Sequence, residues 1–172
     1  YQLPLVLDPV MIAKSGDALL ADDAIAVLRG VLLPRATLLT PNLPEAARLL
    51  DCQMAETRTQ MLDQALALMA MGAQAVLMKG GHAKGPECTD LLVTRDGVII
   101  FSAPRHGTGN THGTGCTLSA AIAAGLAQGH DLTQSVTQAH RYLQAAISAA
   151  DDLSIGHGHG PVHHFHAVWR HA

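Results

Sequence analysis

Residues 112–129 read HGTGCTLSAAIAAGLAQG, in which two glycines flank a threonine, a cysteine follows, and an alanine-rich run leads to Gly129. This pattern predicts a tight glycine turn that opens a helix ending near Gly129. The first N–H groups of a helix have no intrahelical partner and lie at the positive end of the helix dipole. Such a turn is therefore suited to an anion, above all phosphate. The candidate residues for this contact are Gly113, Thr114, Gly115 and Cys116.

Cys116 falls in the first turn of the expected helix, where the dipole favours a thiolate. One short stretch of chain would then hold a transferring phosphoryl group and a candidate base beside it. The other interpretation is a tight loop that enters a packed helix, with Cys116 as a small buried side chain, because short glycine motifs are weak signals alone. The residues of this stretch leave both interpretations open.

The length and composition of the chain favour one domain with a sizeable core. It has 172 residues, of which 48% are hydrophobic and 3% aromatic, and a net charge of −3. This charge gives no electrostatic argument for binding nucleic acid or an anionic membrane. Three cysteines without paired metal-ligand spacing fit a reducing compartment. No leader and no apolar run of spanning length is visible, so we expect a cytoplasmic protein.

Three short apolar runs, at residues 3–7, 36–40 and 73–78, have the pattern of buried parallel strands. The first is closed by Asp8-Pro9, so Asp8 lies at the carboxyl end of a strand, where open α/β sheets place ligands. The alternative for Asp8 is a turn or cap residue.

The second and third runs lead into further polar motifs. Asn42 is a strong helix N-cap candidate, and Glu45 would complement the dipole in the first turn. Capping alone explains both residues, although a capping residue can also face a ligand. Lys79, followed by Gly80 and Gly81, would place a point charge against phosphate oxygens, or would be an exposed lysine in a turn.

Elsewhere the sequence predicts three further helices and a hairpin. Amphipathic helices are expected over residues 21–33, ended by Pro34, and over residues 57–71, with Thr57 and Gln60 spaced as a capping box. The Asp131 to Gln134 spacing gives the same signal for a helix after Gly129. Two apolar segments, 89–94 and 98–102, are joined through Asp96-Gly97, a strong hairpin signal, and would complete one edge of the sheet.

The combined motifs carry a family resemblance. The stretch NTHGTGCTLSAAIAAGLAQG resembles the anion-hole signature of ribokinase-like small-molecule kinases, most of which have an aspartate where this chain has Cys116. The cysteine, together with LDPVM, TPNLPEA, MKGGH and GPVHHFHA in that order, resembles the hydroxymethylpyrimidine/phosphomethylpyrimidine kinases of thiamine biosynthesis. The resemblance covers nearly the whole chain.

The resemblance implies a fold. It is a ribokinase-like three-layer α/β/α domain with a mostly parallel central sheet and an antiparallel edge hairpin. We expect one such domain over residues 1–172, and we expect it to lack the N-terminal third that family members carry. A homodimer or higher homo-oligomer is also expected.

The resemblance also implies roles for the motif residues. ATP and Mg²⁺ are the expected cofactors, with Lys79 and Gly81 at the nucleotide. Asn42, Glu45 and Asp8 would organise the metal and its waters, Asp8 and Glu45 being the metal candidates. Val10 would line the pyrimidine side together with Cys116, and Cys116 would take the proton of the substrate hydroxyl or sit where that proton leaves.

Two other functions compete with this one. Related enzymes accept similar six-membered nitrogen rings, so a pyridoxal or pyridoxine kinase is the first alternative. A nucleotide-binding fragment without catalysis is the second. The histidine-rich tail, residues 156–172, offers closely spaced imidazoles, but no cysteine or carboxylate set completes a tetrahedral site, so no physiological metal is expected there.

Overall fold

The computed structural model describes residues 3–11, 19–83 and 85–169. Contacts within the chain divide it into two compact units, Tyr1–Pro104 and Arg105–Ala172, and each is described by itself. Among the described residues, no helix is long and apolar enough to cross a membrane. The expectation of a single domain over residues 1–172 stays a prediction.

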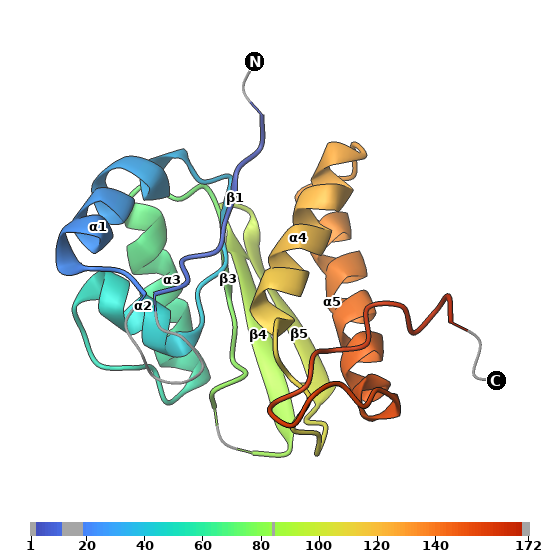
Figure 1. The fold of residues 1–172 in the computed structure, drawn as a ribbon. Helices are drawn as coiled ribbons and strands as arrows, with labels where there is room; N and C mark the ends of the chain where they lie inside the picture. The colour runs from blue at the N-terminus through green and yellow to red at the C-terminus, as the bar shows by residue number, and fades with distance from the viewer. Residues whose placement is uncertain (1–2, 12–18, 84, 170–172) are drawn as a thin grey trace. The chain divides into compact units, whose positions relative to one another are not determined.

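The first unit is a mixed five-stranded sheet with strand order β1-β2-β3-β4-β5 (Figure 1). Pairing is parallel between β1, β2 and β3, and antiparallel from β3 to β4 and from β4 to β5. The α/β class and the antiparallel edge hairpin predicted from the sequence are therefore confirmed. The strands are β1 (Val6–Leu7), β2 (Leu38–Leu39), β3 (Val76–Met78), β4 (Glu87–Thr94) and β5 (Gly97–Pro104).

Helices α1 (Asp22–Val27), α2 (Leu43–Leu50) and α3 (Arg58–Ala70) lie together beside this sheet (Figure 1). The apolar faces of α2 and α3 and the inward side chains of the strands form one core. Burial of these side chains is the main stabilising term of the unit. Its fully buried members include Leu39, Leu43, Leu49, Leu68, Val76, Met78 and Leu91.

The helix expected over residues 21–33 is shorter than predicted. The α-helical part ends at Val27 and continues as a π-helical segment, Leu28–Leu32, and a 3-10 turn, Leu33–Arg35. Pro34 explains the change, because it has no N–H to donate to the carbonyl four residues earlier and its ring clashes with that carbonyl. That earlier residue is Gly30, which is itself a poor helix former.

The second unit is a pair of packed helices, α4 (Thr114–Ala127) and α5 (Leu132–Ser148), followed by a 3-10 turn at Ala150–Asp152 and the tail (Figure 1). The two helices approach closely at Gly125, where an added Cβ would lie 2.9 Å from Ser135 Oγ. Asp131 caps α5 in a capping box with Gln134, as predicted.

Candidate active site

Three polar residues follow the three parallel strands of the first unit. Asp8 comes directly after β1, and Lys79 comes directly after β3. Asn42 and Lys79 form a parallel bridge beyond the ends of β2 and β3, and the Lys79 N–H donates to the Pro41 carbonyl at 2.9 Å. The sheet register thus gathers these side chains at one edge, where parallel sheets bind ligands.

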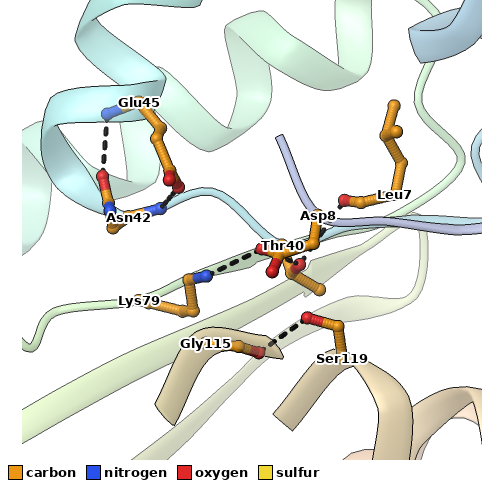
Figure 2. Close-up of polar contacts among 8 residues, drawn as sticks. All are labelled: Leu7, Asp8, Thr40, Asn42, Glu45, Lys79, Gly115 and Ser119. Atoms are coloured by element: carbon orange, nitrogen blue, oxygen red, sulfur yellow. Dashed lines mark hydrogen bonds and ion pairs between the residues drawn. The ribbon is translucent and has the colours of Figure 1, made fainter. Parts of the chain in front are cut away.

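An ion pair joins the first and third of these residues. Lys79 Nζ lies 3.0 Å from Asp8 Oδ1, and the two side chains are only 13% and 14% exposed (Figure 2). Lys79 is therefore not the exposed turn lysine of the alternative interpretation. A charge with so little solvent contact needs a partner, and each of these residues supplies one to the other.

Thr40 is a member of this cluster that sequence reasoning placed only in a strand. It is fully buried, and its hydroxyl lies 3.1 Å from the same Asp8 Oδ1 and 3.4 Å from the Leu7 carbonyl oxygen (Figure 2). The available signal was a threonine at the end of a strand predicted to be buried, because a buried hydroxyl requires a hydrogen-bond partner.

Asn42 and Glu45 form the capping box of α2. The Asn42 side chain accepts from the Glu45 N–H at 2.8 Å, and Glu45 Oε2 accepts from the Asn42 N–H at 2.7 Å (Figure 2). The predicted N-cap is confirmed. Each residue keeps one side-chain group outside the box, the amide nitrogen of Asn42 and the second carboxylate oxygen of Glu45.

Glu45 is a buried carboxyl group, only 5% exposed. Burial raises its pKa, and the nearby Asp8 charge acts in the same direction. Lys79 and the Asn42 N–H act the other way and lower the pKa. Asp8, Glu45 and Lys79 are therefore close enough to form one electrostatic cluster.

The chemistry of this cluster fits Mg²⁺. Its donors are carboxylate and amide oxygens, the ligands that a hard cation prefers, and a nearby cation would offset the cost of burying the Glu45 charge. Among the described residues no group of three or more acidic, histidine or cysteine side chains could enclose an ion. The set suits a cation that keeps most of its ligands as water and phosphate oxygens.

The two glycines after Lys79 differ in what they permit. An added Cβ at Gly80 would lie 2.0 Å from the Thr89 carbonyl oxygen, so packing against β4 explains this glycine. An added Cβ at Gly81 would meet nothing within 4 Å. Gly81 is exposed at the surface. Val10, two residues after Asp8, is 38% exposed.

The glycine turn lies in the second unit and has the predicted form. Gly113 has φ 82° and is the N-cap of α4. The Thr117 N–H donates to the Gly113 carbonyl at 2.8 Å, and Ser119 Oγ donates to the Gly115 carbonyl at 2.7 Å (Figure 2). Within the described part of the chain, the N–H groups of Thr114, Gly115 and Cys116 have no hydrogen-bond acceptor. These three donors can receive an anion.

Cys116 lies in the first turn of α4 and is exposed. The interpretation of Cys116 as a buried filler is therefore wrong. The thiol also lines a surface cavity of about 600 Å³ within the second unit, together with Thr117, Tyr142 and His164. The structure thus gathers Asp8, Thr40, Asn42, Glu45 and Lys79 in the first unit, and Cys116 with its glycine turn in the second. That both groups face one phosphate stays a prediction.

The profile of the phosphomethylpyrimidine kinase family matches residues 1–163. The chain belongs to this family. It is 55% identical over 170 residues to a hydroxymethylpyrimidine/phosphomethylpyrimidine kinase of Escherichia coli (strain K12), an alignment that covers 98% of this chain and 64% of the relative. The chain thus spans about two thirds or less of the length of the curated relatives it matches.

Solved structures agree with this membership and with the ribokinase-like fold. A pyridoxal kinase from Staphylococcus aureus in complex with ADP superposes with a TM-score of 0.87 at 30% identity, covering 96% of this chain and 59% of that one. A phosphomethylpyrimidine kinase from Clostridium difficile 630 gives a TM-score of 0.69 at 37% identity, covering 84% and 57%. The family resemblance drawn from the motifs is confirmed.

Proposed function

We propose that this phosphomethylpyrimidine kinase family member takes part in thiamine biosynthesis as an ATP-dependent kinase. It would phosphorylate 4-amino-5-hydroxymethyl-2-methylpyrimidine and then its monophosphate. The observation that carries the proposal is the buried Asp8–Lys79–Glu45 cluster at the strand ends, in a chain 55% identical to a kinase named for these substrates. A lysine paired with one carboxylate and close to a second is suited to exchange its partner for a phosphate oxygen.

The first unit would bind the nucleotide phosphates. Lys79 contacts phosphate oxygens, and the exposed backbone at Gly81 lets the nucleotide approach. Asp8, Glu45 and Asn42 would hold Mg²⁺ through its water shell. The ion, when bound, neutralises charge on the phosphates. Thr40 keeps the Asp8 carboxylate in place while Lys79 turns to the phosphates.

The second unit would act on the transferring group. The free N–H groups of Thr114, Gly115 and Cys116, with that of Gly113, stabilise negative charge on the γ-phosphoryl. The substrate hydroxymethyl oxygen forms a bond to the γ-phosphorus as the bond from that phosphorus to the bridging oxygen breaks, and ADP leaves. Cys116 accepts the hydroxyl proton or lies where that proton leaves. Val10 lines the ring. In the second reaction a phosphate oxygen of the monophosphate is the nucleophile.

Phosphoryl transfer from γ-labelled ATP·Mg²⁺ tests the proposal directly. The chain is incubated with the pyrimidine alcohol, its monophosphate or pyridoxal, and the labelled product is separated and counted. Label in the pyrimidine monophosphate and diphosphate supports the proposal. Nucleotide binding measured by calorimetry without transfer to any acceptor would identify a binding fragment and overturn the catalytic role.

Pyridoxal kinase activity is the second candidate, and the TM-score of 0.87 with the S. aureus pyridoxal kinase favours it. The 55% identity to the pyrimidine kinase, against 30% to the pyridoxal kinase, favours the pyrimidine. Faster transfer to pyridoxal than to the pyrimidine alcohol in the same assay would reverse this order. The expected homodimer or higher homo-oligomer is tested separately, by light scattering on the protein as it elutes from a size-exclusion column.

A further inference from the structure

The inner half of the histidine-rich tail lies against the glycine turn of the second unit. In Figure 1 the tail, drawn in red, returns beside the lower end of α4. His112, which directly precedes the turn, forms a parallel bridge with Pro161. The His112 N–H donates to the Gly160 carbonyl at 3.1 Å, and the Val162 N–H donates to the His112 carbonyl at 3.4 Å. The turn is thus hydrogen-bonded to the tail on its entry side.

Asn110 makes a second connection. Its Oδ1 accepts from the Gly160 N–H at 3.0 Å, while its Nδ2 donates to the Asp151 carboxylate at 2.9 Å. The two segments are in such close contact that a Cβ added to Gly160 would lie 2.3 Å from Asn110 Oδ1. Only glycine fits at this position without moving the side chain of Asn110.

His164 makes the third connection, and it reaches the first turn of α4. Its Nε2 lies 3.0 Å from Thr117 Oγ1, and Thr117 directly follows Cys116. The backbone carbonyl of His164 accepts from the Tyr142 hydroxyl at 2.9 Å, which ties the same residue to α5. His164 therefore bridges α5 and the turn that carries the thiol and the free N–H groups.

The tail is itself anchored in the unit. Val162 is fully buried and His163 is 2% exposed. The His163 N–H donates to the Ala146 carbonyl of α5 at 2.9 Å. The His163 ring packs edge-on against Trp169, with the ring centroids 5.3 Å apart. Contacts to the turn therefore come from a fixed segment.

We propose that residues 160–164 position the glycine turn and that His164 is a positioning residue for the anion-binding N–H groups and for Cys116. This inference rests on the proposed function. Donors that stabilise a transferring group act best when their direction is set before the reaction, and a turn built on glycines has unusual backbone freedom. The three connections remove that freedom from both ends of the turn. The motif GPVHH then has a role in the reaction without touching the reactants.

The first test uses two glycines of the tail. Gly160→Ala places a Cβ against Asn110, whereas Gly158→Ala, the control, meets nothing within 4 Å. Hydrogen exchange of the His112 and Thr117 amides is measured without ligand, and ADP·Mg²⁺ affinity is measured by calorimetry. We expect Gly160→Ala to speed exchange at both amides roughly tenfold and to weaken ADP binding, with little change in the control. Unchanged exchange at Thr117 in a folded Gly160→Ala variant would overturn the proposal.

The second test separates positioning from packing and does not depend on Gly160→Ala folding. His164→Gln keeps a polar atom near Thr117 Oγ1, and His164→Leu fills similar space without one. We expect His164→Gln to retain most of the Thr117 protection and kcat, and His164→Leu to lose roughly tenfold in both while KM for the pyrimidine changes little. Equal behaviour of the two variants contradicts the proposal. If the parent chain binds no nucleotide, the proposed function fails, while the exchange data still decide whether the tail holds the turn.

Discussion

The Lys79 ammonium pairs with the Asp8 carboxylate across 71 positions of sequence, at 3.0 Å, and joins the ends of β1 and β3. The pair is largely shielded from solvent, and Thr40 binds the same carboxylate oxygen from the strand between them. One oxygen atom of Asp8 thus connects the ends of three strands at the edge where the nucleotide is proposed to bind.

Lys79→Met removes the partner of a mostly buried carboxylate. We expect a loss of about 2 to 4 kcal/mol in the free energy of unfolding at neutral pH, because the unpaired Asp8 charge stays buried. The exposed Arg48–Asp22 pair supplies the control, and Arg48→Met should cost about 0.5 kcal/mol or less. Urea unfolding of both variants measures the difference. Equal losses would mean that burial does not decide the strength of the Asp8–Lys79 pair.

Thr40→Val keeps the shape of the threonine and removes its hydroxyl. We expect a destabilisation of about 1 to 2 kcal/mol and weaker ADP·Mg²⁺ binding, since Asp8 loses a buried hydrogen bond. Thr40→Ser keeps the hydroxyl and should recover most of the binding, although it loses a methyl group. Calorimetric titration checks the order. Ser and Val variants that bind alike would exclude a role of the hydroxyl in holding Asp8.

The raised pKa of Glu45 predicts that the stability of the fold depends on pH. Burial raises the pKa of Glu45 in the folded state above its value in the unfolded chain, so the folded state binds the proton more tightly. The free energy of unfolding therefore falls as the pH rises from the ordinary glutamate range through the raised pKa. Glu45→Gln should remove this fall and make the free energy of unfolding less dependent on pH. Urea unfolding over a series of pH values, with exposed Glu56→Gln as control, measures it. A parallel dependence in parent and Glu45→Gln would refute the assignment.

Cys116→Ala tests the proposed base. We expect turnover to fall by roughly 10² to 10⁴, with ATP affinity nearly intact, because the thiol is proposed to act on the acceptor and not on the nucleotide. Cys52→Ala, which alters another exposed cysteine, should leave turnover unchanged. The readout is transfer from labelled ATP to the pyrimidine alcohol. Near-normal turnover in Cys116→Ala would remove the base assignment.

Much of the local structure could be predicted from the order of residues. The N-cap at Asn42, the capping boxes at Thr57 and Asp131 and the β4–β5 hairpin all appear where expected. Each is decided by hydrogen bonds or backbone preferences within a few residues, so a short window of sequence contains the whole signal. The glycine turn before α4 is of the same kind, since Gly113 alone supplies the positive φ that begins the helix.

The sequence by itself thus determined the family, the strand ends that carry Asp8, Asn42 and Lys79, and the turn that carries Cys116. Only the tertiary structure decided that Lys79 pairs with Asp8, that Thr40 joins them and that the tail binds the turn. The residues in these three contacts are separated in the sequence by 71, 32 and 50 positions. The physical reason is that such contacts depend on strand register and on how helices pack, which the whole chain sets together and no local pattern contains.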